Sequence, residues 1–394
     1  MLLAGKRENI DERRFLSGKM TLKSMLLLCI LLPGLAAAAG IEKFDPIPIR
    51  AIYPPVKPHS SADEALASGH VANEYFKMAK PASKPWRIAF LFPHMKDPYW
   101  IGCSYGVISE ARRLGVAADI FPAEGYDDLI GQLREMDEAI ASRYDAIVIS
   151  PVSMTANNAS IAKARKFGIP VFELANDSTS DDLTTKVTTS LKDMGIDAAR
   201  WVIEDARRRG LRSINIALLP GPLDAGWVKG EVEGTLDEAK RAPIKINIVD
   251  IEYGDSDRIL QARLAAQLIA RYGKELDYII GCTGCAPAAR LPINEAKLDR
   301  KIRVVAYDLT REIADLIERG EIQAAADTKA VSQARVVLDS AVNFLEGRTR
   351  KPPDTILIRL GLVDQSNYAS YPFDTSIGPK RCIPVLSYAP KGMK

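Results

Sequence analysis

The sequence predicts an α/β protein of two lobes, each built on a doubly wound parallel sheet. Its 394 residues exceed what one hydrophobic core usually holds. From Trp86 onward, short apolar runs alternate with amphipathic segments, which is the pattern of βαβ units. The alternation is interrupted by the polar run 176–182 and then starts again, so the chain contains two consecutive series.

The first 85 residues precede this alternation. Residues 1–39 combine basic residues, a short apolar run and small residues before position 40, which is typical of a secretory signal peptide. The apolar run is short for a membrane span, although a membrane anchor is the alternative. Translation starting at Met20 is a second alternative to the first methionine. We therefore expect export to the periplasm. Residues 40–85 are Pro-rich and predict an extended N-terminal arm with one helical stretch near 62–80.

The N-terminal lobe is expected over 86–176 plus 328–353. The run 88–92 is five apolar residues long, as in a strand buried on both faces. Pro93 ends it, and Asp97 before Pro98 predicts an N-cap followed by a first helical residue. Strands are expected at 88–92, 117–122, 146–150 and 170–174, and helices at 99–114, 126–142 and 156–167.

The C-terminal lobe with the tail is expected over 177–327 plus 354–394. Its strands are expected at 214–219, 245–251, 278–281, 304–307 and 322–326, and its helices at 194–209, 227–241, 257–272, 286–296 and 311–319. A last long helix at 331–345 and a strand at 355–360 follow.

Composition excludes several function classes. The chain is 47% hydrophobic and 26% charged, as in an ordinary soluble protein, and its net charge of +3 gives no nucleic-acid footprint. It has three histidines, and no nucleophile elbow, P-loop or dinucleotide-binding motif is found. We expect a non-enzymatic binding protein without metal or cofactor.

Cysteines leave one question open. Cys282 and Cys285 have the C-x-x-C spacing of a redox or metal motif, but no second pair or nearby histidine accompanies them. A structural disulfide or two plain thiols are favoured over a redox enzyme. The pairing among these residues, Cys103 and Cys382 stays open.

Candidate ligand-binding residues follow the carboxyl ends of the expected strands, where open α/β sheets bind ligands. Each of them also suits a cap or a packing position. Together, aromatic rings and carboxylates on facing strand ends predict a hinged ligand trap. The set comprises Asp97, Tyr99, Trp100, Tyr126, Asn176 and Asp177 in the first lobe, and Asp224, Trp227, Thr283, Asp308 and Asp327 in the second.

Three segments carry a family resemblance, namely residues 91–100, residues 304–320 and the tail 376–384. In the second of them, Val-Val-Ala-Tyr-Asp is followed by an expected helix and Gly320. The chain resembles type I periplasmic binding proteins of the ribose-binding and LacI-like class, and within it the TorT-like proteins of the trimethylamine-N-oxide sensing system. The resemblance implies three interlobe crossings, near 176–178, 327–328 and 352–355. It also implies a TorS-like membrane sensor histidine kinase as partner, in two-component signal transduction, and trimethylamine N-oxide as ligand.

Tyr99 and Trp100 match the aromatic cage that the resemblance implies, where rings attract a methylated ammonium group by cation–π interaction. Two positions depart from the family pattern. Leu191 stands where a second-lobe tryptophan is expected, and Asp308 stands where a tyrosine is expected. Sugar-binding relatives use an aspartate like Asp308 for hydroxyls, so a sugar-binding donor protein of an ABC transporter is the alternative, with an ABC permease as partner.

Overall fold

The computed structural model describes residues 46–96, 98–223 and 225–392. The expected signal peptide and the candidates Asp97 and Asp224 lie outside the described residues. Among the helices that are described, none has the length and apolarity needed to cross a membrane.

The first lobe is organised around a nine-stranded sheet in the order β15-β4-β3-β5-β6-β7-β13-β1-β2. Its strands from β4 to β13 run parallel, and β1, β2 and β15 add to the edges in antiparallel pairing. The strands are β1 (Ile47–Tyr53), β2 (His70–Phe76), β3 (Arg87–Phe92), β4 (Ala117–Pro122), β5 (Ala146–Ile149), β6 (Val171–Leu174), β7 (Thr185–Thr188), β13 (Thr355–Ile358) and β15 (Ser387–Tyr388).

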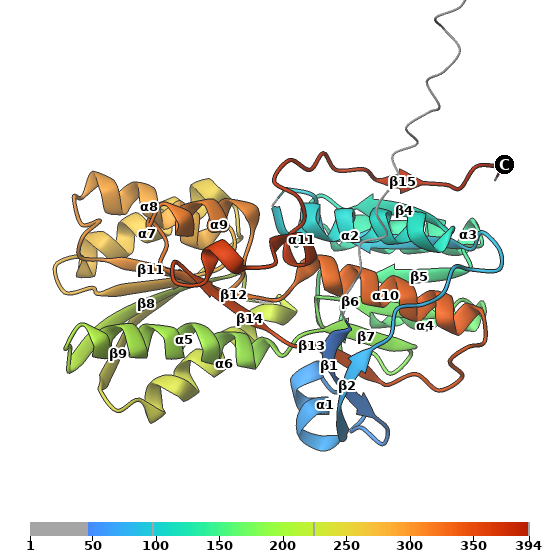
Figure 1. Cartoon of the computed structure of the whole chain (residues 1–394), viewed down its shortest axis with the longest axis horizontal. Helices are drawn as coiled ribbons and strands as arrows, with labels where there is room; N and C mark the ends of the chain where they lie inside the picture. Colours follow the sequence, from blue (N-terminus) through green and yellow to red (C-terminus); the bar gives the residue numbers. More distant parts are fainter. Residues whose placement is uncertain (1–45, 97, 224, 393–394) are drawn as a thin grey trace, which may run out of the picture. The chain divides into compact units, whose positions relative to one another are not determined.

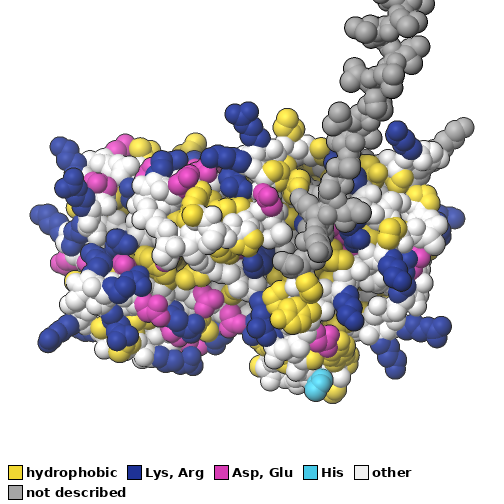
Figure 2. All heavy atoms as spheres, viewed as in Figure 1, with side chains coloured by type: hydrophobic (Ala, Val, Ile, Leu, Met, Phe, Trp, Pro, Cys, Tyr) yellow, Lys and Arg dark blue, Asp and Glu magenta, His cyan; other side chains and the backbone are white. Residues whose placement is uncertain are grey.

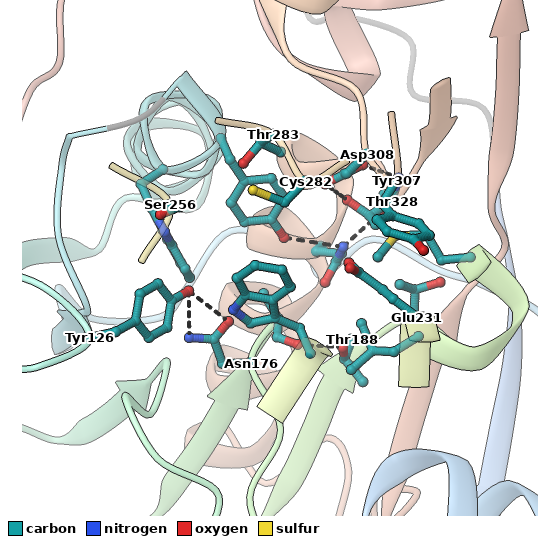
Figure 3. Close-up of a pocket in the computed structure, with 18 residues that line it drawn as sticks. Tyr126, Asn176, Thr188, Glu231, Ser256, Cys282, Thr283, Tyr307, Asp308 and Thr328 are labelled. Carbon is teal, nitrogen blue, oxygen red and sulfur yellow. Dashed lines mark hydrogen bonds between the residues drawn. The ribbon is translucent and has the colours of Figure 1, made fainter. Parts of the chain in front are cut away.

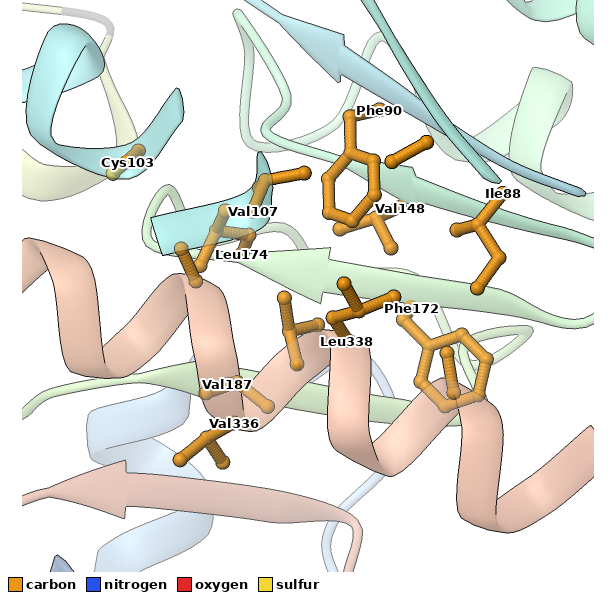
Figure 4. Packing of buried hydrophobic residues seen from close by; sticks show 14 of the residues in the cluster. Ile88, Phe90, Cys103, Val107, Val148, Phe172, Leu174, Val187, Val336 and Leu338 are labelled. Carbon is orange, nitrogen blue, oxygen red and sulfur yellow. The ribbon is translucent and has the colours of Figure 1, made fainter. Parts of the chain in front are cut away.

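Helices cover both faces of this sheet (Figure 1). Helices α2 (Pro98–Leu114) and α10 (Ala330–Leu345) share one core with Phe90 and Phe92, whereas α3 (Leu129–Ala141) and α4 (Asn158–Lys166) share the other with Ala89 and Leu91. Successive residues of β3 thus face opposite cores, which explains its unbroken apolar run. Figure 4 shows Phe90, Val148 and Phe172 packing with residues of α10.

The second lobe contains a six-stranded sheet in the order β14-β12-β11-β10-β8-β9, parallel except for β14. The core on one face includes α5, and the core on the other includes α8 and α9. The elements are α5 (Leu191–Arg208), β8 (Ser213–Gly221), α6 (Gly226–Arg241), β9 (Lys245–Tyr253), α7 (Arg258–Tyr272), β10 (Tyr278–Gly281), α8 (Cys285–Glu295), β11 (Arg303–Ala306), α9 (Arg311–Glu318), β12 (Ala324–Asp327) and β14 (Gly361–Asp364).

The chain passes between the sheets after β7, after β12 and between β13 and β14, which gives the three crossings of the expected fold class. A fourth passage, through the short η1 (Tyr368–Ser370) and α11 (Phe373–Ser376), brings the tail strand β15 back to β4. The first crossing lies at residues 189–190 instead of 176–178, and β13 belongs to the first sheet. The division of the chain therefore differs from the expected boundaries at 176/177 and 353/354.

Strand β7 explains the displaced first crossing. Its sequence Thr-Lys-Val-Thr lacks an apolar run, yet all four residues are buried. The buried ammonium of Lys186 donates to Asp177 Oδ1 at 3.0 Å and to the Ser60 carbonyl at 3.0 Å. Because a polar network replaces apolar burial here, hydrophobic periodicity does not detect the strand.

The N-terminal arm is part of the first lobe, not an extended lead-in. Strand β1 pairs with β13 and β2 pairs with β1. Between them, α1 (Ala62–Ser68) begins with a capping box formed by Ser61 and Glu64. The expected helical stretch ends at Ser68, and residues 70–76 are strand.

Basic and acidic side chains are interspersed over the described part of the face seen in Figure 2. This mixed distribution agrees with a chain of low net charge.

Candidate ligand-binding site

A small pocket is lined by residues from both lobes. The lining residues are Tyr99, Trp100, Tyr126, Ala175, Asn176, Thr188, Thr189, Leu191, Met194, Trp227, Glu231, Ser256, Cys282, Thr283, Tyr307, Asp308, Thr328 and Gln333. None of the described lining residues is Lys, Arg or His, so the pocket offers no full positive charge to an anion.

Aromatic rings form much of the wall. Trp100, in the first turn of α2, is 2% exposed, and its ring lies 4.9 Å from that of Phe92 and 5.1 Å from that of Tyr99. Tyr126 of the first lobe and Trp227 of α6 are in edge contact at the pocket wall, with ring centroids 6.2 Å apart. Both lobes therefore contribute aromatic rings to the lining, which suit a methylated or cationic group.

Asn176 follows β6 and is held in place by hydrogen bonds. Its side-chain amide donates to the Pro151 carbonyl at 3.0 Å and to the Tyr126 hydroxyl at 3.2 Å (Figure 3). The preceding residue, Ala175, has a left-handed backbone with φ of 64°, uncommon for a residue other than glycine or asparagine. This strained turn presents the Asn176 amide to the pocket.

Asp308 follows β11 and ties that strand end to the second crossing. Its carboxylate accepts hydrogen bonds from the Thr328 amide at 2.9 Å, the Thr328 hydroxyl at 2.8 Å and the Leu309 amide at 2.8 Å. Burial raises the pKa of Asp308 to about 8, although the bonds from Thr328 and Leu309 oppose that rise. Three protein donors occupy this carboxylate, so it has less capacity left for ligand hydroxyls than a free aspartate.

Glu231 on α6 is the other carboxyl group in the wall, and it was absent from the predicted set. It is 2% exposed, and its Oε2 atom has no hydrogen-bond partner. Burial, and secondly the carboxyl of Asp308, raise the pKa of Glu231 well above its usual range. Its position four residues after Trp227 was the available signal, since residues at that spacing share a helix face.

Seven predicted residues line the pocket: Tyr99, Trp100, Tyr126, Asn176, Trp227, Thr283 and Asp308. Leu191, noted as the replacement for an expected tryptophan, also lines it. Asp177 and Asp327 are not among the lining residues. Asp177 accepts hydrogen bonds from Lys186 and the Ala62 amide, and Asp327 accepts from the Lys329 amide and the Tyr371 hydroxyl. Both therefore have structural partners.

Residues that sequence reasoning missed include Gln333, Thr188 and Met194, in addition to Glu231. Gln333 belongs to the helix after the second crossing, and its side-chain nitrogen donates to the Thr328 carbonyl at 2.7 Å. These residues carry no motif of their own, because only the folding of the two lobes brings them to one cavity.

The C-x-x-C pair forms a disulfide that joins Cys282, in the loop after β10, to Cys285, the first residue of α8. Cys282 and Thr283 line the pocket, so the disulfide braces the loop that carries both. Of the alternatives left open by the sequence, the structure has the disulfide. Among the described residues, no group of histidine, cysteine or acidic side chains is arranged to hold a metal ion.

Comparisons with known proteins agree with this architecture. A family model described as a periplasmic binding protein domain matches residues 88–349. Periplasmic protein TorT of Escherichia coli K12 is 29% identical over 296 residues, covering 74% of this chain and 83% of TorT. The D-allose-binding periplasmic protein of Escherichia coli K12 is 26% identical over 246 residues, covering 60% of this chain and 77% of that protein. Both relatives are binding proteins, not enzymes.

Two solved structures are similar over most of the chain. An ABC transporter solute binding protein from Bradyrhizobium sp. BTAi1, solved with bound Bis-Tris, is 31% identical with a TM-score of 0.73, covering 87% of this chain and 99% of that one. The complex of the TorS sensor domain with TorT in the presence of TMAO is 25% identical with a TM-score of 0.68, covering 76% and 99%. The chain belongs to the periplasmic binding protein family.

Proposed function

We propose that this protein is an exported sensory binding protein that captures a small methylated-amine ligand, trimethylamine N-oxide or a related compound, and reports it to a TorS-like membrane sensor histidine kinase. The observation that carries the proposal is the aromatic lining of the pocket, to which both lobes contribute and in which the described residues include no basic side chain. Aromatic faces attract methylated nitrogen.

The relatives support each part of this proposal. TorT is periplasmic, and it has been solved in complex with the TorS sensor domain in the presence of TMAO. The Bradyrhizobium protein holds Bis-Tris, a tertiary amine that carries hydroxyl groups. The signal-peptide pattern of residues 1–39 supports export.

Within the proposal, ligand contact is assigned to the seven predicted residues that line the pocket, and Asp177 and Asp327 are assigned structural roles. Asp97 and Asp224 stay predictions. The remaining space around the rings is closed by apolar residues such as Leu191 and Met194.

Isothermal titration calorimetry with trimethylamine N-oxide tests the ligand. We expect binding that is weakened at least tenfold in Trp227→Leu, because this substitution removes one aromatic face. Trp86→Leu is the matched control, since Trp86 is also partly buried but is not among the pocket residues. Equal affinities in wild type and Trp227→Leu would contradict the site. Co-purification of the protein with a TorS-like sensor domain, with and without ligand, tests the signalling.

The second candidate function is a sugar donor to an ABC permease. It is favoured by Asp308 and Asn176, whose polar side chains line the pocket, and by similarity to an ABC transporter solute binding protein. A thermal-shift panel separates the two functions: stabilisation by pentoses with none by amine oxides would reject the sensory ligand. A sensor kinase gene beside this one would favour the first function, and a permease gene the second.

A further inference from the structure

Two residues of α6 that line the pocket each carry a buried polar atom that has no hydrogen-bond partner among the described residues. Trp227 Nε1 and Glu231 Oε2 are both buried, and neither has a hydrogen-bond partner among the described residues. The two residues are four positions apart, so their side chains are neighbours on the helix surface, about 5–6 Å apart at Cβ. Both line the pocket. The face thus offers one unmet donor and one unmet acceptor side by side.

Within residues 46–392 as described, no cation acts on the carboxyl of Glu231, whose only charged neighbour of note is Asp308. On α5, which packs against α6, Lys192 pairs with Asp237 at 2.7 Å and Asp193 pairs with Arg50 at 2.6 Å. From the side of β11, the titratable groups near Glu231 are Asp308 and Tyr307. Burying a carboxyl group without a hydrogen-bond donor or a cation beside it costs free energy. A ligand that supplies such a donor or cation therefore binds more tightly.

Trp227 Nε1 imposes the complementary requirement. An indole N–H can only donate, and leaving it buried without an acceptor is unfavourable. An occupant that satisfies both atoms carries a positively charged donor and, close to it, an oxygen acceptor. Gln333 lines the same pocket, and its Oε1 is a further acceptor without a partner in the described part of the chain. A ligand with a second donor, such as a hydroxyl, would therefore bind more tightly.

We propose that the ligand is a small protonated amino alcohol, whose ammonium N–H donates to Glu231 and whose hydroxyl oxygen accepts from Trp227 Nε1. This inference rests on the proposed function, since it assigns the ligand of the same pocket. An amine oxide or a quaternary ammonium ion can contact the aromatic rings but has no N–H to give to Glu231, so we expect it to bind more weakly than the amino alcohol. A neutral sugar brings donors but no charge, and an anion would face two carboxyl groups.

Proton release accompanies binding of such a ligand. Burial and the carboxyl of Asp308 raise the pKa of Glu231 in the empty pocket. The bound ammonium favours the carboxylate, so the proton leaves to the buffer and affinity rises with pH while the amine stays protonated. Asp308 and Tyr307 are the other titratable groups near Glu231, and substitution of Glu231 alone separates its contribution from theirs.

Calorimetry with matched probes tests the inference: N,N-dimethylethanolamine, which has an N–H, choline, which does not, trimethylamine N-oxide and D-ribose. We expect dimethylethanolamine to bind at least tenfold more tightly than choline, and to release up to one proton when measured in buffers of different ionisation enthalpy. In Glu231→Gln the affinity for dimethylethanolamine should fall at least tenfold and the proton release should disappear. Glu233→Gln, an exposed carboxyl on the same helix, is the control and should change neither.

Three outcomes overturn the inference. Equal affinities for dimethylethanolamine and choline, or an unchanged affinity in a Glu231→Gln variant that unfolds like wild type, would show that Glu231 does not select the ligand. Tight binding of trimethylamine N-oxide that is independent of Glu231 would overturn it and leave the proposed function standing. Binding of D-ribose without any amine would overturn both.

Discussion

The first-lobe wall of the pocket and the α6 part of the second-lobe wall differ in how their polar atoms are satisfied. On the first-lobe wall, Tyr126 and Asn176 bond to each other, Asn176 also bonds to the backbone, and Trp100 is packed against Phe92. On the second-lobe wall, Asp308 accepts from three protein donors, whereas Trp227 Nε1 and Glu231 Oε2 of α6 have no hydrogen-bond partner among the described residues. Gln333 Oε1 is the exception on the first side. We infer that the first wall is a preformed aromatic surface and that α6 selects the ligand's polar groups.

The largest expected effect is on the first wall. Trp100→Ala should lower the free energy of unfolding by about 3–5 kcal/mol, because it empties a core position that is 2% exposed. Urea unfolding followed by circular dichroism measures the change. Wild-type stability in this variant would mean that Trp100 is not part of the core, and the contrast between the walls would fail.

Asp177 tests whether a buried carboxyl outside the pocket is structural. Asp177→Ala removes the partner of the buried Lys186 ammonium at 3.0 Å, and we expect a loss of about 3 kcal/mol in unfolding free energy. Ligand affinity, measured by calorimetry below the unfolding transition, should stay within about twofold of the wild-type value, because Asp177 is not among the residues that line the pocket. A selective loss of binding at full stability would return Asp177 to the ligand set.

Asp308 predicts a pH dependence of stability. Its pKa in the folded protein, about 8, exceeds the ordinary value of 3.8, so the folded state binds this proton more tightly and stability falls as pH rises from about 4 to about 8. Asp308→Asn removes this contribution. Relative to wild type, the variant should gain at least about 1 kcal/mol between pH 5 and pH 7 in urea unfolding. Parallel pH profiles for the two proteins would contradict the assignment.

Trp227→Phe is the mildest change on the second wall, because it keeps an aromatic ring and deletes the indole N–H. Unfolding free energy should change by less than about 1 kcal/mol, since no protein hydrogen bond is lost. Affinity for a hydroxylated amine should fall roughly fivefold to tenfold by calorimetry. The same loss for an amine without an oxygen would show that the ring, not the N–H, is responsible.

Much of the fold could be predicted because the parallel strands are apolar on both faces. The run 88–92 predicts β3, whose alternate residues fill two cores. Strand β7 could not be predicted in this way, because Lys186 is buried by a network with Asp177 and Ser60 that only the folded chain assembles. The arm strand β1 was hidden by prolines, yet it completes the sheet by pairing with β13.

The site was predictable where residues follow strand ends. Trp227, Thr283 and Asp308 were found by that rule and line the pocket. Glu231 lies a full turn inside α6, where an acidic residue normally faces solvent, and its burial depends on the packing of the lobes. Asp327 follows a strand end as expected, but its carboxylate is taken up by Tyr371 from the tail.

The most direct test of the claim that α6 selects the ligand is a crystal structure of the complex with N,N-dimethylethanolamine. The account predicts the ligand nitrogen within hydrogen-bond distance of Glu231 Oε2 and the ligand oxygen within hydrogen-bond distance of Trp227 Nε1. A nitrogen held against the rings of Tyr99 and Trp100, with Glu231 still unpartnered, would contradict it.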